Sequence, residues 1–450
     1  VGAWVGALVG ERVGARDGSD VGCFVSKHSI STSIIEEMTD MLSTISEARI
    51  YNKKPPSGPP TEYPTLSSEE LDLARKTADG HLLGVEAAYS KITLMEDQLA
   101  PIDVDLPSPE SLDGEFIWGI DGSNKSLDYS AFHILIARAA IVEFEYSKEK
   151  QLTYHEIKKI DMSGVCMVDQ NIFDDDVYLF GNSPKKDTSK NISWIDILEN
   201  NSSLVVGFDP STTDNKPSSH AQGWCVKLMH TGELMALTKI PEKKSGVVVR
   251  DGPLLPVAAT MKDTIRAMKV VLNWENKHLM SVSKRIQEST LFVEFLTNPS
   301  NEKNMEYYFP DQRVSSDILS KLPADYLLLP KILKPGQRTP FLEAIPKNRA
   351  PIPKKHPQLS PISCYYMRKR KPHNIIRIEF PRIYLDDENL ERLNWSLGFV
   401  AWQHEIGASV PMIQEAADSQ CQVKAEVSIL QNIARSELSK KGLGTLEVYE

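Results

Sequence analysis

The sequence predicts an α/β protein whose core is a mixed β-sheet with flanking helices, and three observations indicate this class. An apolar run at 115–120 leads into Asp121-Gly122-Ser123, and a second run rich in Ile, Val and Phe follows at 129–144. The two runs predict an antiparallel hairpin with Asp121 at the end of its first strand. A short apolar strand at 246–254 ends in another Asp-Gly pair, at Asp251, and has helical periodicity on both sides.

The same patterns assign the remaining elements in chain order. A capping signal, Ser67-Ser68-Glu69-Glu70, opens a helix expected to run toward Leu99. Gly223 and Gly232 weaken the helical pattern around them, because glycine opposes a stable helix. The expected strands lie at 204–208, where a buried helix turn is the alternative, at 279–283 and at 375–380. The expected helices lie at 31–51, 67–99, 220–238, 260–274, 387–403 and 412–438.

Composition limits the class of protein. The chain has 450 residues, of which 41% are hydrophobic and 25% charged, which excludes a wholly disordered or collagen-like chain. No apolar run reaches the ~18–20 residues that span a bilayer, so no membrane segment is predicted. The five cysteines are odd in number and far apart, which argues against a disulfide framework or a cysteine zinc site and predicts a reducing, cytoplasmic location. The net charge of -10 still allows a local basic groove on an acidic body.

Three parts of the chain differ in character. Residues 1–29 repeat Val-Gly and predict a disordered or non-native tail. Residues 30–110 are expected to form a helical N-terminal region with a proline-rich linker at 53–64. Residues 111–440 hold the predicted α/β domain.

The two Asp-Gly pairs are the strongest chemical signal. Carboxylates at the ends of neighbouring strands would form a negative pocket, and glycine permits a sharp turn beside each. Glu233, 18 residues before Asp251 on a predicted helix, could point into the same pocket. Oxygen ligands of this kind favour Mn²⁺ or Mg²⁺, which assist phosphodiester hydrolysis. Ordinary hairpin turns and a solvated helix glutamate are the alternatives.

At this point the residues resemble the NurA nucleases. The resemblance covers about 115–438, and its five segments occur in the family's order. They are Gly119-Ile120-Asp121-Gly122-Ser123, Val248-Val249-Arg250-Asp251-Gly252-Pro253-Leu254 with Glu233 before it, Val282-Ser283-Lys284-Arg285, Arg377-Ile378-Glu379-Phe380-Pro381, and Val410-Pro411-Met412 to Cys421.

The resemblance implies an RNase H-like core, a dimer, and a Mn²⁺-dependent 5′ to 3′ exonuclease with single-strand endonuclease activity. It also implies a HerA-like hexameric ATPase as the partner in DNA end processing. By carry-over, Asp121, Glu233 and Asp251 would be catalytic metal ligands, with Mn²⁺ as the ion and Mg²⁺ as an alternative.

The closing helix departs from the family pattern. The family usually has a Tyr-Pro pair and then a metal-binding histidine after alanine, whereas this chain has Val410 at the tyrosine position and Asp418 after Ala417. Aspartate can replace histidine as an oxygen ligand, so Asp418 is expected to complete the metal site. A decayed site in a non-cleaving subunit is the alternative.

The segment at 344–378 is basic and contains no acidic residue, and its prolines are expected to keep part of it extended. Basic residues interleaved with aromatic ones could follow a DNA backbone and stack on bases. A solvated surface loop, and for Lys284 and Arg285 a structural ion pair, are the alternatives. The expected DNA-binding residues are Lys284, Arg285, Lys354, Lys355, Tyr366, Arg368, Lys369 and Arg370.

Other catalytic classes lack their motifs. The chain has no phosphate-binding Gly-x-x-x-x-Gly-Lys-Ser/Thr, so a partner would have to hydrolyse ATP, and it has no Gly-x-Ser-x-Gly or His-Glu-x-x-His. Two functions therefore stand: a metal-dependent DNase, or a catalytically silent DNA- or translocase-binding subunit. The sequence does not separate DNA from RNA or branched substrates.

Overall fold

A computed structural model describes residues 88–128, 132–148, 151–167, 177–179, 193–200, 203–207, 217–284, 286, 289–298, 307–308, 325–370, 374–423 and 427. The predicted tail at 1–29, the helix at 31–51 and the proline-rich linker at 53–64 lie outside these residues. Within them, no helix has the length and apolar character needed to cross a membrane.

Five strands form the centre of one mixed sheet. Their order is β5-β4-β3-β8-β9. β3, β4 and β5 are antiparallel neighbours, whereas β8 is parallel to β3 and β9 is parallel to β8. This order and these directions are those of an RNase H-like core, so the predicted fold class is confirmed. The strands are β3 (Phe116–Asp128), β4 (Phe132–Ser147), β5 (Gln151–Met167), β8 (Gly246–Asp251) and β9 (Lys277–Ser283).

Further strands extend the sheet on both sides. β7 and then β6 follow β5 on one side, and β13, β12, β11 and β1 follow β9 on the other, while β10 pairs with β12 and β2. These strands are β1 (Tyr89–Leu94), β2 (Ile102–Asp103), β6 (Val177–Leu179), β7 (Ser203–Gly207), β10 (Gln337–Arg338), β11 (Leu342–Pro346), β12 (Pro361–Met367) and β13 (Ile375–Pro381).

The predicted helix running toward Leu99 is wrong at its C-terminal end. Tyr89–Leu94 is strand β1, which pairs antiparallel with β11, more than 200 residues away. Distant pairing of this kind overrides local helical periodicity. The sheet therefore begins before residue 111.

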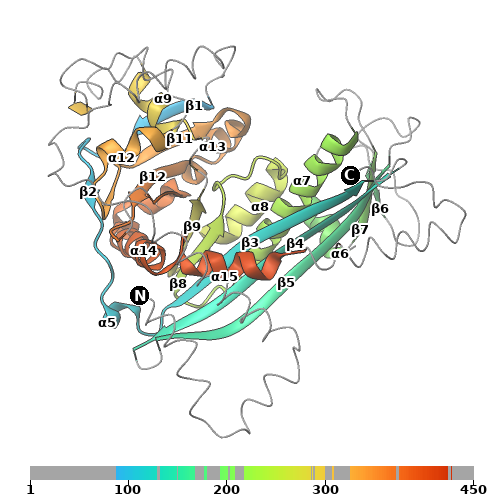
Figure 1. The fold of residues 1–450 in the computed structure, drawn as a ribbon, viewed down its shortest axis with the longest axis horizontal. Coiled ribbons are helices and arrows are strands. Elements are labelled where there is room, and N and C mark those ends of the chain that lie inside the picture. The colour runs from blue at the N-terminus through green and yellow to red at the C-terminus, as the bar shows by residue number, and fades with distance from the viewer. Residues whose placement is uncertain are drawn as a thin grey trace, which may run out of the picture. The chain divides into compact units, whose positions relative to one another are not determined.

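Helices cover both faces of the central strands (Figure 1). α7 (Pro217–Thr238) contacts β3, β4 and β5 and packs beside α8 (Met261–Leu272), which Thr260 caps through its side chain. α14 (Asp387–Ile406) and α15 (Met412–Cys421) contact β8, and α15 also contacts β3 and β4. The helix predicted at 412–438 therefore ends at Cys421 in the described part of the chain. The short helices and 3-10 turns are α5 (Pro109–Leu112), α6 (Trp194–Asn200), α9 (Leu291–Thr297), η2 (Asp325–Leu327), α12 (Leu329–Ile332), η3 (Lys347–Arg349), α13 (Pro351–Lys355), η4 (Pro357–Leu359) and η5 (Arg382–Leu385).

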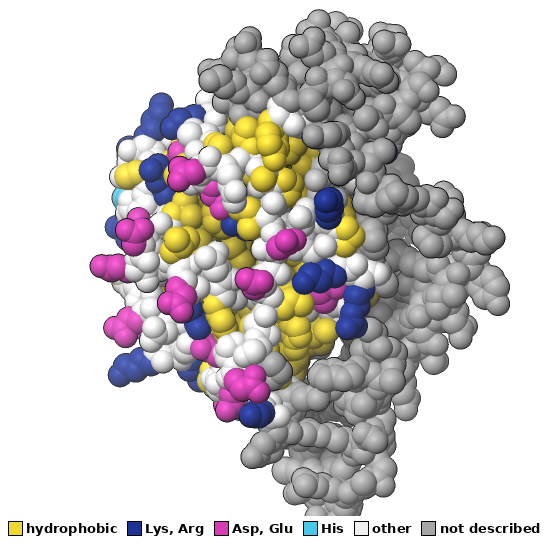
Figure 2. Space-filling view, turned by 90° about the vertical axis from the view of Figure 1, so that its left-hand side faces the viewer, with side chains coloured by type: hydrophobic (Ala, Val, Ile, Leu, Met, Phe, Trp, Pro, Cys, Tyr) yellow, Lys and Arg dark blue, Asp and Glu magenta, His cyan; other side chains and the backbone are white. Residues whose placement is uncertain are grey.

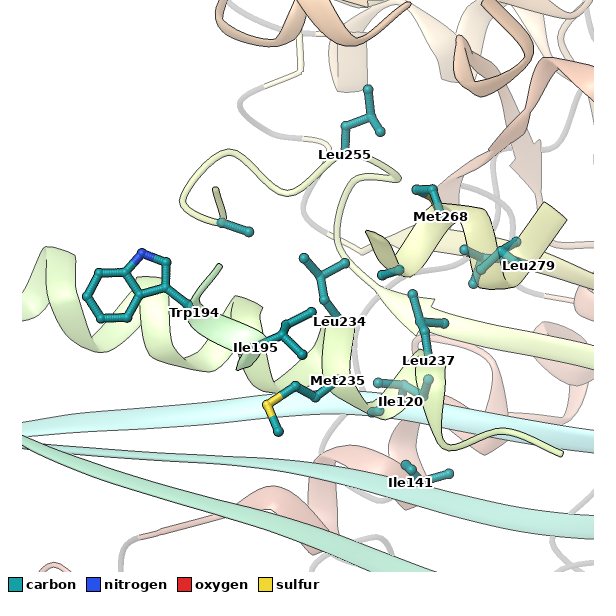
Figure 3. Close-up of a cluster of buried hydrophobic side chains, with 14 of the residues drawn as sticks. Ile120, Ile141, Trp194, Ile195, Leu234, Met235, Leu237, Leu255, Met268 and Leu279 are labelled. Carbon is teal, nitrogen blue, oxygen red and sulfur yellow. The ribbon is translucent and has the colours of Figure 1, made fainter. Parts of the chain in front are cut away.

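Two hydrophobic clusters lie on opposite faces of the central strands. Ile120 belongs to the cluster under α7 and α8, with Leu234, Met268 and Leu279 (Figure 3). Ile117 belongs to the cluster under α14 and α15. Successive side chains of a strand point to opposite faces. The odd-numbered residues of β3 around Ile117 therefore point toward α15, and Asp121 is one of them.

Gly119 lets α15 approach β3 closely. A Cβ added at this position would lie 2.4 Å from the backbone oxygen of Ile413 in α15. We expect Gly119→Ala to lower the free energy of unfolding by about 1–3 kcal/mol, because backbone has to move. Gly223→Ala is the matched control, since no atom lies within 4 Å of its added Cβ and alanine favours the α7 helix. Denaturant unfolding compares them, and an equal or smaller loss for Gly119→Ala would contradict the close contact.

Candidate metal centre

The two predicted aspartates lie side by side because of strand register. β3 pairs in parallel with β8 up to Ile120 and Arg250, so the next residues along are Asp121 and Asp251. Asp251 ends β8 as predicted, and Gly252 after it has a φ of 84°, which suits glycine in a sharp turn. The prediction that Asp121 ends its strand is wrong: β3 continues to Asp128 because its pairing with β4 continues. The pocket forms where β8 stops and β3 does not.

Lys284 connects the two carboxylates. Its Nζ lies 3.9 Å from Asp121 Oδ2 and 3.6 Å from Asp251 Oδ2, and its side chain is 32% exposed. Burial lowers the pKa of Lys284, but the negative charges of Asp251 and Asp121 outweigh burial and leave the pKa above its ordinary value. Gln414 of α15 donates from Nε2 to Asp251 Oδ1 and to the carbonyl oxygen of Val282. Asp251 is thus held from two directions.

Asp121 is a deeply buried carboxylate of the pocket. Only 2% of the residue is exposed, and burial, followed by the negative charge of Asp251, raises its pKa well above the ordinary value. Its Oδ1 accepts a hydrogen bond from the Gly122 N–H. Its Oδ2 is buried and has no hydrogen-bond donor within the part of the chain that the structure describes. A buried acceptor of this kind fits a bound cation, because a cation would satisfy it.

Asp418 reaches the same pocket from α15. One carboxylate oxygen of Asp418, one of Asp121 and the Cys421 sulfur all lie within 4.8 Å of one another. Val410, at the other position that departs from the family pattern, is buried at the start of this segment and donates its N–H to Glu415. The closing helix therefore brings Asp418 beside Asp121.

Glu233 approaches from the opposite face of the sheet. Its Oε1 lies 2.7 Å from where a Cβ on Gly122 would be, so this glycine leaves the room that Glu233 occupies. Its Oε2 accepts a hydrogen bond from Arg250 NH1 at 2.7 Å, in a pair whose side chains are both almost completely buried. Burial raises the pKa of Glu233 to about 7, although the charge of Arg250 opposes this. Arg250 also donates to the carbonyl oxygen of Pro253, after the Asp-Gly turn.

The donor set fits a hard divalent cation. Asp121, Asp251 and Asp418 supply carboxylate oxygens, which are the ligands that Mn²⁺ and Mg²⁺ prefer. The negative charges of Asp251, Glu233 and Asp418 all act on Asp121, whereas Lys284 is the positive charge that acts on it. A cation would relieve this repulsion in the same way that Lys284 relieves part of it.

The basic segment at 344–378 consists largely of short helices and strands, so it is not the solvated surface loop that was the alternative. Residues 361–367 form the fully buried strand β12. Tyr366 is 1% exposed and donates its hydroxyl to Glu405 Oε1 at 3.0 Å, so its ring has no free face for a base. Arg368 is also buried, and it donates to the carbonyl oxygens of Ala408 and Glu405. The expected DNA contacts of these two residues are therefore wrong.

The other expected DNA-binding residues have different surroundings. Lys354 and Lys355 are exposed on α13, and Lys369 and Arg370 are exposed after β12. Arg285 lies outside the described residues. On the molecular face drawn in Figure 2, the acidic and basic side chains of the described residues are interspersed, so these residues form no continuous basic stripe there.

The sequence patterns did not predict three residues that contact or adjoin the carboxylates of the site. Cys421 lies three positions after Asp418, and this spacing on a helix was a usable signal for a shared face. Arg250 precedes the Asp-Gly pair, where a buried arginine on the face opposite to Asp251 follows from strand alternation. Gln414 had no local signal, because its contact with Asp251 depends on how α15 packs.

The sheet and the carboxylates beside its central strands define the class of this protein: it is an α/β protein with an RNase H-like core. The family model described as the NurA domain matches residues 168–418, more than half of the chain, including Glu233, Asp251, Lys284 and Asp418. The chain therefore belongs to the NurA domain family, which is a family of nucleases.

Three solved structures are similar to this chain over most of its length. The NurA nuclease from Sulfolobus solfataricus is 11% identical, over 92% of this chain and 98% of that chain, with a TM-score of 0.36. A NurA bound to dAMP and manganese is 10% identical, over 88% and 94%, with a TM-score of 0.27. An endonuclease V from Bacillus subtilis is 9% identical, over 83% and 95%, with a TM-score of 0.26. A search of curated proteins found no match.

Proposed function

We propose that this chain is a Mn²⁺-dependent deoxyribonuclease. The observation that carries the proposal is the cluster of Asp121, Asp251 and Asp418 around Lys284, in which the buried Asp121 Oδ2 has no hydrogen-bond donor among the described residues. Membership of a nuclease family and the manganese in the NurA structure with dAMP support the reaction and the ion. Mg²⁺ has the same ligand preference and is the alternative ion.

The residues of the pocket would have different roles in the reaction. Asp121, Asp251 and Asp418 would hold the ion, with Glu233 as a further ligand from the α7 face. A divalent ion held there supplies Lewis acidity to the phosphodiester and to an attacking water. The Lys284 ammonium, already between the two aspartates, would exchange part of that contact for a non-bridging phosphate oxygen and so orient the scissile group.

The test is cleavage of end-labelled single- and double-stranded DNA by the full chain, with Mn²⁺, with Mg²⁺ and with a chelator. We expect cutting with Mn²⁺, none with the chelator, and loss of cutting in Asp251→Asn. Glu391→Gln is the matched control, since Glu391 is an exposed acid on α14. Cutting that persists in the chelator or in Asp251→Asn would contradict the proposal.

DNA binding is expected to depend on the exposed basic residues and not on the buried ones. We expect Lys369→Gln with Arg370→Gln to weaken binding of all sequences similarly and to reduce the salt slope by about 1 per removed contact. Tyr366→Phe should leave DNA affinity unchanged, because this ring is buried. Fluorescence anisotropy over a salt series measures both effects. A loss of affinity in Tyr366→Phe alone would contradict this assignment.

The oligomeric state and the partner are part of the same proposal. We propose a 5′ to 3′ exonuclease and single-strand endonuclease that works at DNA ends as a homodimer with a HerA-like hexameric ATPase. Exposed Lys347, Lys354, Lys355, Lys369 and Arg370 would line the DNA path in the dimer. We also propose that residues 111–440 form the nuclease domain, with residues 89–103 completing its sheet, and that residues 1–29 are a tail outside it.

A second function is favoured by one observation. Lys284 already bridges Asp121 and Asp251, and a lysine in this position can neutralise a pocket that holds no ion. The protein would then be a catalytically silent subunit that binds DNA or the translocase. Calorimetry with Mn²⁺ separates the two functions: a saturable site lost in Asp251→Asn supports the nuclease, and no site with intact stimulation of a partner ATPase supports the silent subunit.

A further inference from the structure

Cys421 is a buried thiol that the nuclease proposal does not use. It is the last residue of α15 and is fully buried, with its sulfur next to carboxylate oxygens of Asp121 and Asp418. Asp418 and Cys421 are three positions apart, so both side chains lie on the same side of the helix. Among the described residues, these three form the one close group of His, Cys, Asp or Glu donors.

A second observation points to a ligand at this group. Asp121 Oδ2 is buried without a hydrogen-bond donor in the described part of the chain, and Asp121 is one of the three members. The Cys421 thiol makes only a weak hydrogen bond, to the carbonyl oxygen of Asp418 at 3.2 Å. Among the described residues, Asp121 Oδ2 has only the 3.9 Å ion pair with Lys284, and the Cys421 thiol has only this weak bond, so both groups can take a cation as a further partner.

The distances suit a shared ion. An ion about 2.0–2.2 Å from each carboxylate oxygen and about 2.3 Å from the sulfur holds those donors no more than about 4.5 Å apart. The three donor atoms lie within 4.8 Å of one another, so small side-chain rotations would close the group around one ion. A coordinated thiol loses its proton outright, which removes the S–H that now reaches the Asp418 carbonyl.

We propose that Asp121, Asp418 and Cys421 form a mixed oxygen and sulfur site that binds thiophilic divalent cations, such as Zn²⁺ and Cd²⁺, more tightly than Mg²⁺. Thiolate is a soft ligand that favours these ions, whereas carboxylates alone favour Mg²⁺ and Mn²⁺. The proposal deepens the proposed function, because it rests on the same pocket and assigns it a ligand outside the carboxylate set. Occupation by a thiophilic ion would compete with Mn²⁺ for Asp121.

The test is a titration of the full chain with Cd²⁺ in a buffer whose reductant is not a thiol, followed by the sulfur-to-cadmium charge-transfer absorbance. We expect a saturable band in the wild type. Cys421→Ser should remove that band and lower Cd²⁺ affinity by at least about tenfold, with Mg²⁺ affinity from calorimetry unchanged. Cys364→Ser is the matched control, since Cys364 is a buried free cysteine on β12, and it should keep the band.

A band of wild-type size in Cys421→Ser would overturn the proposal, and so would equal losses of Cd²⁺ and Mg²⁺ affinity. If Cys421→Ser does not fold, Asp418→Asn decides: weaker Cd²⁺ binding supports the site and an unchanged titration overturns it. The nuclease assay is read separately. A Cys421-dependent band in a protein that cuts no DNA would reject the nuclease and keep this site, and cutting without the band would do the reverse.

Discussion

Asp121→Asn is expected to abolish Mn²⁺-dependent DNA cleavage while leaving the metal-free protein at least as stable as the wild type. Loss of activity should be at least about 100-fold, because removal even of a group that only orients a metal ligand costs about 10–100-fold. Asparagine keeps the shape of the side chain but supplies a neutral and weaker ligand. Single-turnover cleavage measures the loss of activity, and calorimetry with Mn²⁺ measures the loss of metal affinity.

The stability follows from the pKa of Asp121. Burial and the charge of Asp251 raise this pKa above the value in the unfolded chain. A carboxyl whose pKa is raised on folding destabilises the folded state once pH exceeds the unfolded value, and the loss is complete above the folded value. Asparagine removes that cost at neutral pH. A variant that loses activity through unfolding, with a lower melting temperature than the wild type, would contradict this account of Asp121.

Arg250→Met is expected to destabilise the protein by about 3–5 kcal/mol, which is the cost of leaving one member of a buried ion pair alone. Arg250 is fully buried, and without it Glu233 would be left buried without its partner, whether its carboxyl group stays ionised or takes up a proton. The double variant Arg250→Met with Glu233→Met should recover most of this loss, because removing both members avoids an unpaired charge. Denaturant unfolding of the four proteins forms a double-mutant cycle.

A surface pair of similar chemistry is the control. Arg266 bridges Asp196 and Glu199 with a side chain that is 37% exposed. Surface pairs contribute about 0–1 kcal/mol, so Arg266→Met should cost far less than Arg250→Met. Equal costs for the two substitutions would show that the Arg250 and Glu233 pair does not behave as a buried one.

Much of the central sheet could be predicted from local pattern. The hairpin of β3 and β4, the short strand β8 and the helix α8 with its Thr260 cap follow from alternation, apolar runs and capping residues. The segment of β1 could not be predicted, because its conformation is set by pairing with β11 far along the chain. Local periodicity carries no information about such a partner.

The residues of the site also divide into those that local pattern predicts and those that it does not. Asp251 at the end of β8 was predictable, and so was a lysine near it, because both lie in short motifs at strand ends. The burial of Tyr366 and Arg368 was not, because both contact Glu405, which lies in α14 and far along the chain. A count of basic residues in a segment does not reveal which of them a distant acid and backbone carbonyls bury.

The central claim is that one divalent ion is held by Asp121, Asp251 and Asp418. A crystal structure with Mn²⁺, with the ion located by its anomalous scattering, tests it most directly. The account predicts a peak within coordination distance of Asp121 Oδ2 and of both other carboxylates, with the Lys284 ammonium moved away from Asp121. No peak in this pocket at a Mn²⁺ concentration that supports cleavage, or a peak bound elsewhere, would contradict it.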